Sequence, residues 1–316
     1  MRMLAAVDPG RAVLRVGGTD AAAFLQDLVT NDLGRMSEEA ALYSALLTPQ
    51  GKFLFDFLLF TERAPAAPDA STDDDLPGGA SGEAGAEPAI LIDVAASRAQ
   101  ALVQRLTMYR LRRNVSIALT ELSTLLIWPD PGFAASQPAE GAVPDPGTRA
   151  PDGQFDAPAA GALRDPRHAG LGWRLLTDTP ADALARLDAA AGDLASYEAL
   201  RIGLGVPATG AELRADETFI LEAGFERFHG VDFKKGCYVG QEVTARMKHK
   251  AELRKGLARV ALSGDAPPGT PVTAGERPAG TLFSVSGTIG LAHLRFDRAN
   301  GPLQAGAAEL RLIERL

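Results

Sequence analysis

The chain has 316 residues, 46% of them hydrophobic and 23% charged, which is typical of a soluble protein with two or three domains. Its formal charge of −8 excludes a protein whose whole surface attracts nucleic acid, because phosphate binding needs a concentrated positive field. A single cysteine excludes an intrachain disulfide, and no apolar run reaches the ~18 residues that a membrane span needs. With too short an apolar run before Asp8 for a signal peptide, we expect a cytoplasmic protein that binds neither membranes nor nucleic acid.

The first part of the chain predicts two helices and a series of strands. FLQDLVTNDL, residues 24–33, spaces its apolar residues on one helical face, with Thr19 or Asp20 as the N-cap. A second helix opens at Ser97. The apolar runs that predict strands cover residues 41–49, 52–62, 89–94, 114–119 and 123–129. This order predicts an α+β fold in which helices pack on a mainly antiparallel sheet.

Two stretches interrupt this pattern. Residues 63–89 and 129–161 are rich in proline, alanine, glycine and acidic residues and hold almost no large apolar ones. Such segments cannot bury enough surface to offset the entropy of ordering. We therefore expect two flexible loops, of which the first carries much of the negative charge.

The second half of the chain changes from mixed to all-β character. LGWRLLT, residues 171–177, predicts a strand, residues 180–191 a helix, and the amphipathic run from Ser196 another helix that stops before Pro207. From about Gly256 onward, five short apolar runs are separated by glycine, proline, asparagine and aspartate. That spacing is typical of a small β-barrel or sandwich.

The stretch VDFKKGCYVGQEVTARMKH, residues 231–249, contains the only cysteine, Cys237, in a segment that reads as a strand, a tight turn and a helix. Lys234, Lys235 and the start of the helix would favour the thiolate, and flanking glycines would let other groups approach closely. Residue types alone still favour the alternative, a buried thiol that packs as a small hydrophobe.

Other polar residues also allow two interpretations. Asp56 interrupts the apolar strand FLFDFLLF, where a carboxylate must be paired, functional, or exposed at a strand edge. Arg110 and Arg112 fall at the end of a predicted helix, where they would complement the helix dipole or hold a carboxylate. The four histidines show no ligand spacing, and no dinucleotide fingerprint is present, so a metal site built from this chain alone is not expected.

Taken together, the motifs resemble a known family. KKGCYVGQE, preceded by YEALRIGLGVP and LEAGFERFHGVDF, is similar to the signature of the YgfZ family of folate-binding proteins, whose mitochondrial relatives mature iron-sulfur proteins. That family is similar in turn to the T-protein of the glycine cleavage system, a tetrahydrofolate-dependent aminomethyltransferase. LLTPQGKFLFDFLLF, LTMYRLRRNVSI and AGTLFSVSGTIGLAHLR extend the resemblance over nearly the whole chain.

The resemblance implies a T-protein-like α+β fold of three modules in a ring, with a folate pocket facing the centre. The first module would comprise residues 1–50 and 162–255, with an inserted ferredoxin-like module at 51–161 and a C-terminal β-barrel at 256–316. It also implies a monomer whose partners are folate and iron-sulfur scaffold, carrier or client proteins.

The resemblance also implies site residues. Asp56 would face the reactive nitrogen of folate, Glu198 would bind the pterin ring, Tyr197 would stack on it, and Arg110 and Arg112 would hold the glutamate tail. Within the motif, Cys237 would be the reactive thiol, with Lys235, Tyr238, Gln241 and Glu242 as further binding residues.

Two functions follow from these residues. In one, a tetrahydrofolate-binding accessory protein assembles or repairs iron-sulfur clusters, with Cys237 contacting a partner, a folate-borne one-carbon unit, or a transient cluster shared with a partner. In the other, the protein is a folate-dependent one-carbon transferase. The chain departs from the T-protein pattern at Gln241, where the T-protein has a basic residue, which favours the first function.

Overall fold

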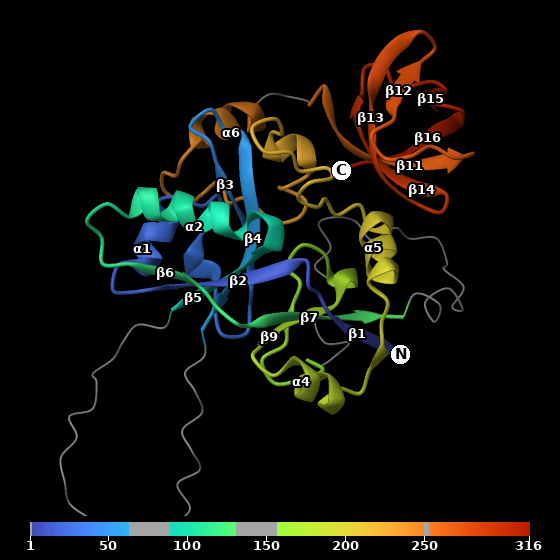
Figure 1. Ribbon diagram of the computed structural model, residues 1–316. Helices are drawn as coiled ribbons and strands as arrows, with labels where there is room; N and C mark the ends of the chain where they lie inside the picture. Colours follow the sequence, from blue (N-terminus) through green and yellow to red (C-terminus); the bar gives the residue numbers. More distant parts are fainter. Residues whose placement is uncertain (1, 63–88, 131–156, 250–252) are drawn as a thin grey trace, which may run out of the picture.

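The computed structural model describes residues 2–62, 89–130, 157–249 and 253–316, which form two sheets and a barrel (Figure 1). The flexible loops expected at 63–89 and 129–161 lie almost entirely outside the described residues. None of the helices described is long and apolar enough to cross a membrane.

The first sheet, called here the β4 sheet, has the antiparallel order β3-β4-β5-β2-β6. Its strands are β2 (Arg11–Gly17), β3 (Leu42–Leu47), β4 (Phe53–Thr61), β5 (Ile90–Ala95) and β6 (Ser116–Leu119). Helices α1 (Ala21–Gln26) and α2 (Ala96–Arg110) cover one face (Figure 1), packing Phe24 and Leu106 against Phe57. The other face carries Asp56, Leu58 and Phe60, so β4 is buried on both sides and reads as a continuous apolar run.

The second sheet, the β7 sheet, has the order β10-β1-β7-β9-β8. Its strands are β1 (Met3–Val7), β7 (Ser123–Pro129), β8 (Leu163–Arg164), β9 (Trp173–Thr177) and β10 (Ala190–Ala191). Helix α4 (Pro180–Arg186) packs against β1 and β7, and the 3₁₀ helix η2 (Ala169–Leu171) precedes β9. The β4 sheet is inserted into the β7 sheet, because β1 comes before it in the chain and β7 after it.

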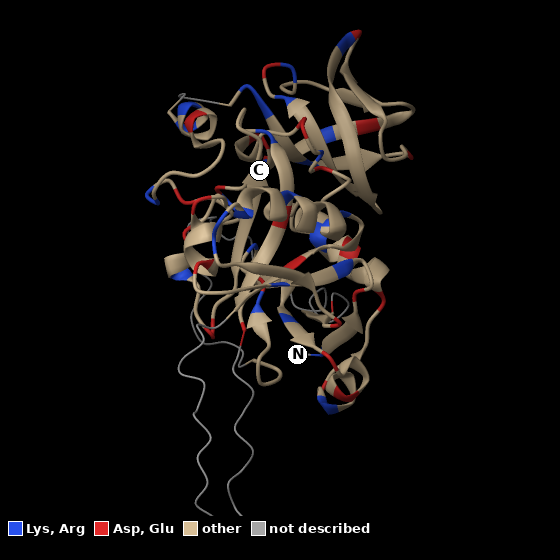
Figure 2. Ribbon diagram, turned by 60° about the vertical axis from the view of Figure 1, so that its left-hand side comes forward, with Lys and Arg blue, Asp and Glu red and all other residues tan. Residues whose placement is uncertain are grey.

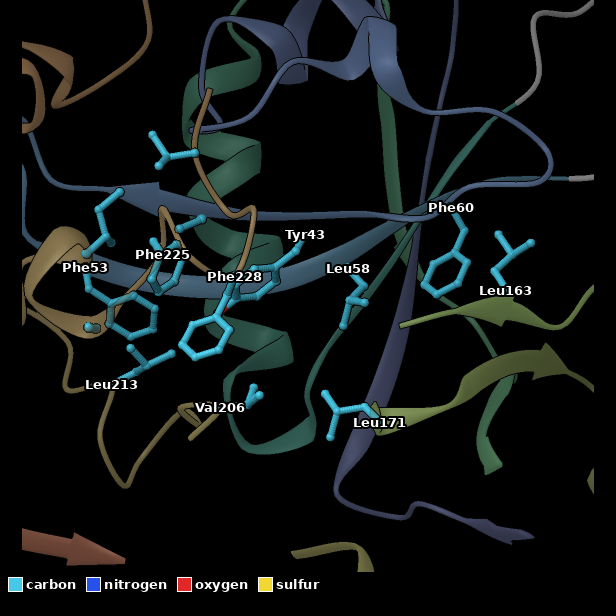
Figure 3. Packing of buried hydrophobic residues seen from close by; sticks show 14 of the residues in the cluster. Tyr43, Phe53, Leu58, Phe60, Leu163, Leu171, Val206, Leu213, Phe225 and Phe228 are labelled. Atoms are coloured by element: carbon cyan, nitrogen blue, oxygen red, sulfur yellow. The ribbon is translucent and has the colours of Figure 1, made fainter. Parts of the chain in front are cut away.

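The faces of the two sheets meet in one apolar cluster. Figure 3 shows Leu58 and Phe60 of β4 in the same cluster as Leu163 and Leu171. At the other end, the Tyr43 ring of β3 stacks on Phe225, with ring centroids 5.0 Å apart. The segment that leads to Cys237 is therefore anchored in the same core as both sheets.

The C-terminal residues close into a six-stranded barrel of order β11-β14-β13-β12-β15-β16 (Figure 1). Its strands are β11 (Lys255–Ser263), β12 (Pro271–Ala274), β13 (Arg277–Ser286), β14 (Ile289–Arg295), β15 (Leu303–Ala305) and β16 (Ala308–Arg315). The barrel expected from the spacing of short apolar runs is confirmed, and β15 is one strand more than the five runs suggested. Helix α5 (Leu194–Gly203) contacts β13 and β14 and so joins the barrel to the rest.

The sheets divide the chain differently from the module boundaries given above. A boundary after residue 50 falls inside the β3–β4 hairpin, in which Ala45 pairs with Asp56. Both strands are apolar and pair across a short turn, so they cannot belong to separate sheets. Residues 11–119 form the β4 sheet with its helices, whereas β7 pairs with β1.

Two local predictions were wrong for the same physical reason. The helix expected over residues 24–33 ends at Gln26, because Thr30 and Asn31 turn their side chains to backbone groups, Thr30 donating to the Gly230 carbonyl at 2.6 Å. The strand expected before Cys237 is an irregular turn, in which the Asp232 carboxylate accepts from the Lys234 and Lys235 N–H groups. In both places side chains bond to backbone groups in competition with helix and sheet, through contacts distant in sequence at Thr30 and local ones at Asp232.

Smaller differences concern element ends. The helix expected over residues 180–191 ends at Arg186, and its last residues form β10. Helix α2 begins at Ala96, one residue before Ser97, and α5 begins at Leu194. The remaining elements are α6 (Gln241–Lys248) and the 3₁₀ helices η1 (Leu33–Arg35) and η3 (Ile220–Ala223).

Candidate functional site

A cavity of about 330 Å³ lies where the two sheets meet α5. Its size falls within the ~300–1,000 Å³ of small-molecule sites. The wall is part polar and part apolar, and its charged residues are Asp8, Arg11, Asp56, Arg167, Arg174, Glu198 and Arg201. Asp56, Tyr197 and Glu198, three of the residues singled out in the sequence, line this cavity together.

Asp56 reaches the cavity from the middle of β4 and is only 3% exposed. The hydroxyl of Tyr43 donates to its Oδ2 at 3.1 Å, and the hydroxyl of Thr209 donates to Oδ1. Burial and the nearby Asp56 carboxylate raise the pKa of Tyr43 well above its usual value, so this hydroxyl keeps its proton. The buried carboxylate is thus paired by neutral donors.

Helix α5 supplies Leu194, Tyr197, Glu198 and Arg201 to the wall. Tyr197 is buried, its ring lies edge-on to Trp128 with centroids 5.4 Å apart, and its hydroxyl accepts from Arg174 at 3.3 Å. The Glu198 carboxylate is 52% exposed and is held by Arg201, one turn further along the helix. Arg201 also reaches the buried Glu212 at 3.2 Å and Ser284 of the barrel at 3.2 Å. This arginine links the cavity wall to the barrel.

Beneath the cavity lies a buried network of alternating charges. Arg174 donates to Asp93 and to Asp165, both at 2.9 Å, and Asp165 also accepts from Arg167 at 2.6 Å. Although burial alone would raise it, the two guanidinium groups hold the pKa of Asp165 far below its ordinary value. The network fixes Arg167 and Arg174 in the cavity wall with their charges already partnered.

Sequence reasoning missed Arg11, Arg167, Arg174, Arg201 and Thr209 as cavity residues. One signal was available: Arg174 interrupts the apolar strand LGWRLLT in the same way that Asp56 interrupts its own strand. The others come from the start of β2, from loops and from α5, and only the packing of the sheets brings them together.

Cys237 is exposed and lies outside the cavity wall. The buried packing role that residue types favoured is therefore wrong. On one side of it Lys235 is buried, and on the other Tyr238 is buried, whereas Gly236 between them is exposed. Gly236 and Cys237 therefore form a short exposed segment, called here the Cys237 step, between two buried residues.

Lys235 holds this step to the turn that follows α1. Its ammonium donates to the backbone carbonyls of Gln26 at 2.7 Å, Val29 at 2.5 Å and Asn31 at 3.1 Å. All three of its donors are used by these carbonyls. Burial lowers the pKa of Lys235 to about 8, which leaves it protonated at neutral pH.

The motif residues after Cys237 contact other parts of the fold and do not line the cavity. A Cβ on Gly240 would lie 2.5 Å from the Thr48 carbonyl oxygen, and its φ of +83° also favours glycine. Burial raises the pKa of Tyr238 to about 12. Gln241 and Glu242 begin α6, half-buried and exposed respectively, and neither lines the cavity.

Arg110 and Arg112 also lie away from the cavity, exposed at the end of α2. Arg110 donates to the Val115 carbonyl at 3.3 Å. That these arginines hold the tail of a folate stays a prediction. Among the described residues, no three histidine, cysteine, aspartate or glutamate side chains gather so as to hold a metal ion.

Comparison with known proteins adds three findings. Residues 254–314 match the family model described as CAF17, C-terminal beta-barrel domain, which covers the barrel. The chain is 34% identical over 320 residues to the mouse (Mus musculus) iron-sulfur cluster assembly factor IBA57, mitochondrial, covering 96% of this chain and 81% of that protein. The human (Homo sapiens) protein of the same name is 33% identical, with 95% and 80% covered.

Among solved structures, the chain is similar to the glycine cleavage system aminomethyltransferase T from Bartonella henselae. The TM-score is 0.70, with 14% sequence identity, and the match covers 100% of this chain and 86% of that one. At this identity the likeness concerns the fold alone. It confirms the T-protein-like α+β fold expected from the sequence.

Proposed function

Because the chain belongs to the family of IBA57 iron-sulfur cluster assembly factors, we propose that it acts in the assembly or repair of iron-sulfur clusters in client proteins. The observation that carries this proposal is the similarity to two mammalian relatives over almost the whole chain, barrel included. In its finer form the proposal assigns the cavity to tetrahydrofolate and the working thiol to Cys237.

The cavity supports a folate through its size and its acceptors. Glu198 offers a half-exposed carboxylate that Arg201 holds in place, and a carboxylate can accept the paired N–H donors of a pterin ring. Tyr197 provides an aromatic part of the wall, and Asp56 lines the same cavity. When bound, tetrahydrofolate would supply reduced ring nitrogens that can carry a one-carbon unit.

The exposure of Cys237 supports a role toward another protein. A thiol that stands on the surface between two buried anchors can reach a second molecule, whereas the cavity lies elsewhere. One thiolate can supply one ligand of a cluster while a partner supplies the others. In this proposal the cluster is cargo, held for a time between Cys237 and the partner.

Separate variants test the role of Cys237 and the assignment of the cavity to tetrahydrofolate. In a strain that depends on this protein, Cys237→Ser should lower the activity and cluster content of iron-sulfur enzymes while the purified variant still binds tetrahydrofolate. Glu198→Gln should weaken tetrahydrofolate binding in calorimetry about tenfold or more, as expected for loss of a charged hydrogen-bond acceptor. Glu242→Gln, an exposed carboxylate outside the cavity, is the matched control.

Several outcomes would count against the proposal. Full activity of iron-sulfur enzymes with Cys237→Ser would remove the thiol from the mechanism. Equal tetrahydrofolate affinity in wild type and Glu198→Gln would remove the pterin assignment. Turnover of an aminomethyl donor by the purified protein, abolished in Asp56→Asn, would favour the one-carbon transferase instead.

A further inference from the structure

Arg201 donates hydrogen bonds to three separate parts of the chain. A guanidinium group has five N–H donors in a fixed planar fork. In Arg201 two of them go to the Glu198 carboxylate, of which Nε–Oε2 measures 2.8 Å. Two more go to the loop that follows α5, to the Val206 carbonyl and to Glu212. The last goes to the hydroxyl of Ser284, on barrel strand β13, at 3.2 Å. Because the side chain is only 4% exposed, these partners fix the guanidinium in one position.

The same guanidinium is connected to both carboxylates singled out in the cavity. It holds Glu198 directly, and through Glu212 it holds the loop whose Thr209 hydroxyl donates to Asp56. Burial alone would lower the pKa of Arg201, but the Glu198 and Glu212 carboxylates raise it above its ordinary value. The side chain therefore stays charged, and its bonds to the two glutamates are charge-assisted.

A bulge in β13 turns Ser284 toward α5. The pairing of β13 with β14 shifts register between Leu282 and Ser284, so that Phe283 is an extra residue without a partner across the ladder. In a regular strand residues two apart share a face, which would place Ser284 in the barrel interior with Leu282. The extra residue changes this alternation, so that Val285 packs against the barrel core and the Ser284 hydroxyl meets Arg201. The bulge is therefore what brings a barrel side chain to the cavity wall.

Other contacts also join the barrel to α5. Ile202 packs into a small apolar cluster with two barrel leucines, and Arg259 of β11 donates to the Gly203 carbonyl at the end of the helix. Basic and acidic residues both colour the ribbon where the barrel meets the rest of the chain (Figure 2). These contacts hold α5 in place, but within the described residues the barrel contact that leads on to Glu198 is the one from Ser284.

We propose that Arg201 and Ser284 are positioning residues for the cavity. The barrel hydroxyl holds the guanidinium, and the guanidinium holds the Glu198 carboxylate where it accepts the paired N–H donors of a ligand ring. The barrel thus sets the affinity of the cavity, and a ligand in the cavity stabilises this part of the barrel, because coupling between two sites is reciprocal. The inference rests on the proposed function for the identity of its ligand, tetrahydrofolate.

Calorimetric titration with tetrahydrofolate measures the effect. Ser284→Ala removes the hydroxyl without adding bulk and should weaken binding about three- to tenfold, as expected for loss of one hydrogen bond that orients a charged group. Ser286→Ala, two residues further along β13, is the matched control and should keep the wild-type affinity. Arg259→Met removes a different link between the barrel and α5, so it should lower the melting temperature and leave the affinity unchanged.

Two further measurements separate positioning from general structural support. If Ser284 acts through Glu198, Ser284→Ala should cause no further loss of affinity in a Glu198→Gln protein, because both substitutions impair the same contact. Hydrogen exchange supplies the reciprocal measurement. Tetrahydrofolate should slow the exchange of the β13 amides around Ser284 in the wild type and leave it unchanged in Ser284→Ala.

Four results would overturn the proposal while leaving tetrahydrofolate in the cavity. They are unchanged affinity in Ser284→Ala, an equal loss in Ser286→Ala, additive losses in the double variant, and β13 exchange that tetrahydrofolate does not slow in the wild type. A wild-type protein that binds no tetrahydrofolate would instead remove the assignment of the cavity, and the role of Ser284 in binding would fall with it. The wild-type titration therefore distinguishes the two failures.

Discussion

The ammonium nitrogen of Lys235 lies 5.1 Å from the centroid of the Tyr238 ring. These two buried residues flank exposed Gly236 and Cys237, so a short exposed step is held at both ends. A cation over an aromatic ring is worth about 0.5–2 kcal/mol, more when buried. The position of the only thiol in the chain therefore depends on side chains that face away from solvent.

Lys235→Met should lower the free energy of unfolding by about 1–3 kcal/mol, because three backbone carbonyls lose their donor. The neighbouring Lys234 is exposed, so Lys234→Met is a matched control with an expected change within about 0.5 kcal/mol. Urea denaturation followed by tryptophan fluorescence measures both. Equal effects of the two substitutions would show that the carbonyl contacts contribute little.

The two glycines beside Cys237 should respond differently to alanine. At Gly240 the added Cβ meets the Thr48 carbonyl at 2.5 Å and φ is +83°, so Gly240→Ala should cost about 1–3 kcal/mol of stability. At Gly236 no atom lies within 4 Å of the added Cβ, so Gly236→Ala should be nearly neutral. Thermal melting of both variants measures the contrast, and comparable losses would contradict it.

Asp165 should make the fold sensitive to acid. The pKa of Asp165 in the folded protein is far below the unfolded value of about 3.9. Its contribution to the free energy of unfolding is therefore complete at neutral pH and is lost progressively as the pH falls below about 4. Between pH 7 and pH 3 the wild type should lose about 1 kcal/mol more than Asp165→Asn, because at pH 3 the unfolded state binds a proton that the folded state does not. Urea titrations at both pH values provide the comparison. Parallel losses in the two proteins would mean that Asp165 is not held ionised.

Gly192→Ala should disturb the cavity wall without touching the cavity. The new Cβ would lie 2.3 Å from the Trp128 ring, which packs edge-on against Tyr197. We expect a stability loss of about 1–3 kcal/mol, a shifted tryptophan emission and weaker tetrahydrofolate binding.

Gly203→Ala gives the opposite expectation at the end of α5. No atom lies within 4 Å of its added Cβ, so the helix should gain about 0.5–1 kcal/mol with unchanged binding. If Gly192→Ala changed neither stability nor tetrahydrofolate binding, the packing of Trp128 on Tyr197 would not be needed to hold the cavity wall in place.

The sequence by itself determined the class of fold and the identity of the motifs. Continuous apolar runs such as FLFDFLLF predicted strands that are buried on both faces, and short runs between glycines predicted the barrel, because burial periodicity is a local property. It also singled out Asp56, Tyr197 and Glu198, which share one cavity wall.

Only the tertiary structure decided what surrounds these residues. Cys237 is exposed because Lys235 reaches carbonyls more than 200 residues earlier in the chain, a contact that no local pattern contains. Arg167 and Arg174 are held in the cavity wall by ion pairs with Asp93, which lies in β5 of the β4 sheet, and Asp165, which directly follows β8 of the β7 sheet. Long-range pairing of charges and carbonyls depends on how the sheets pack, and that packing is a property of the whole chain.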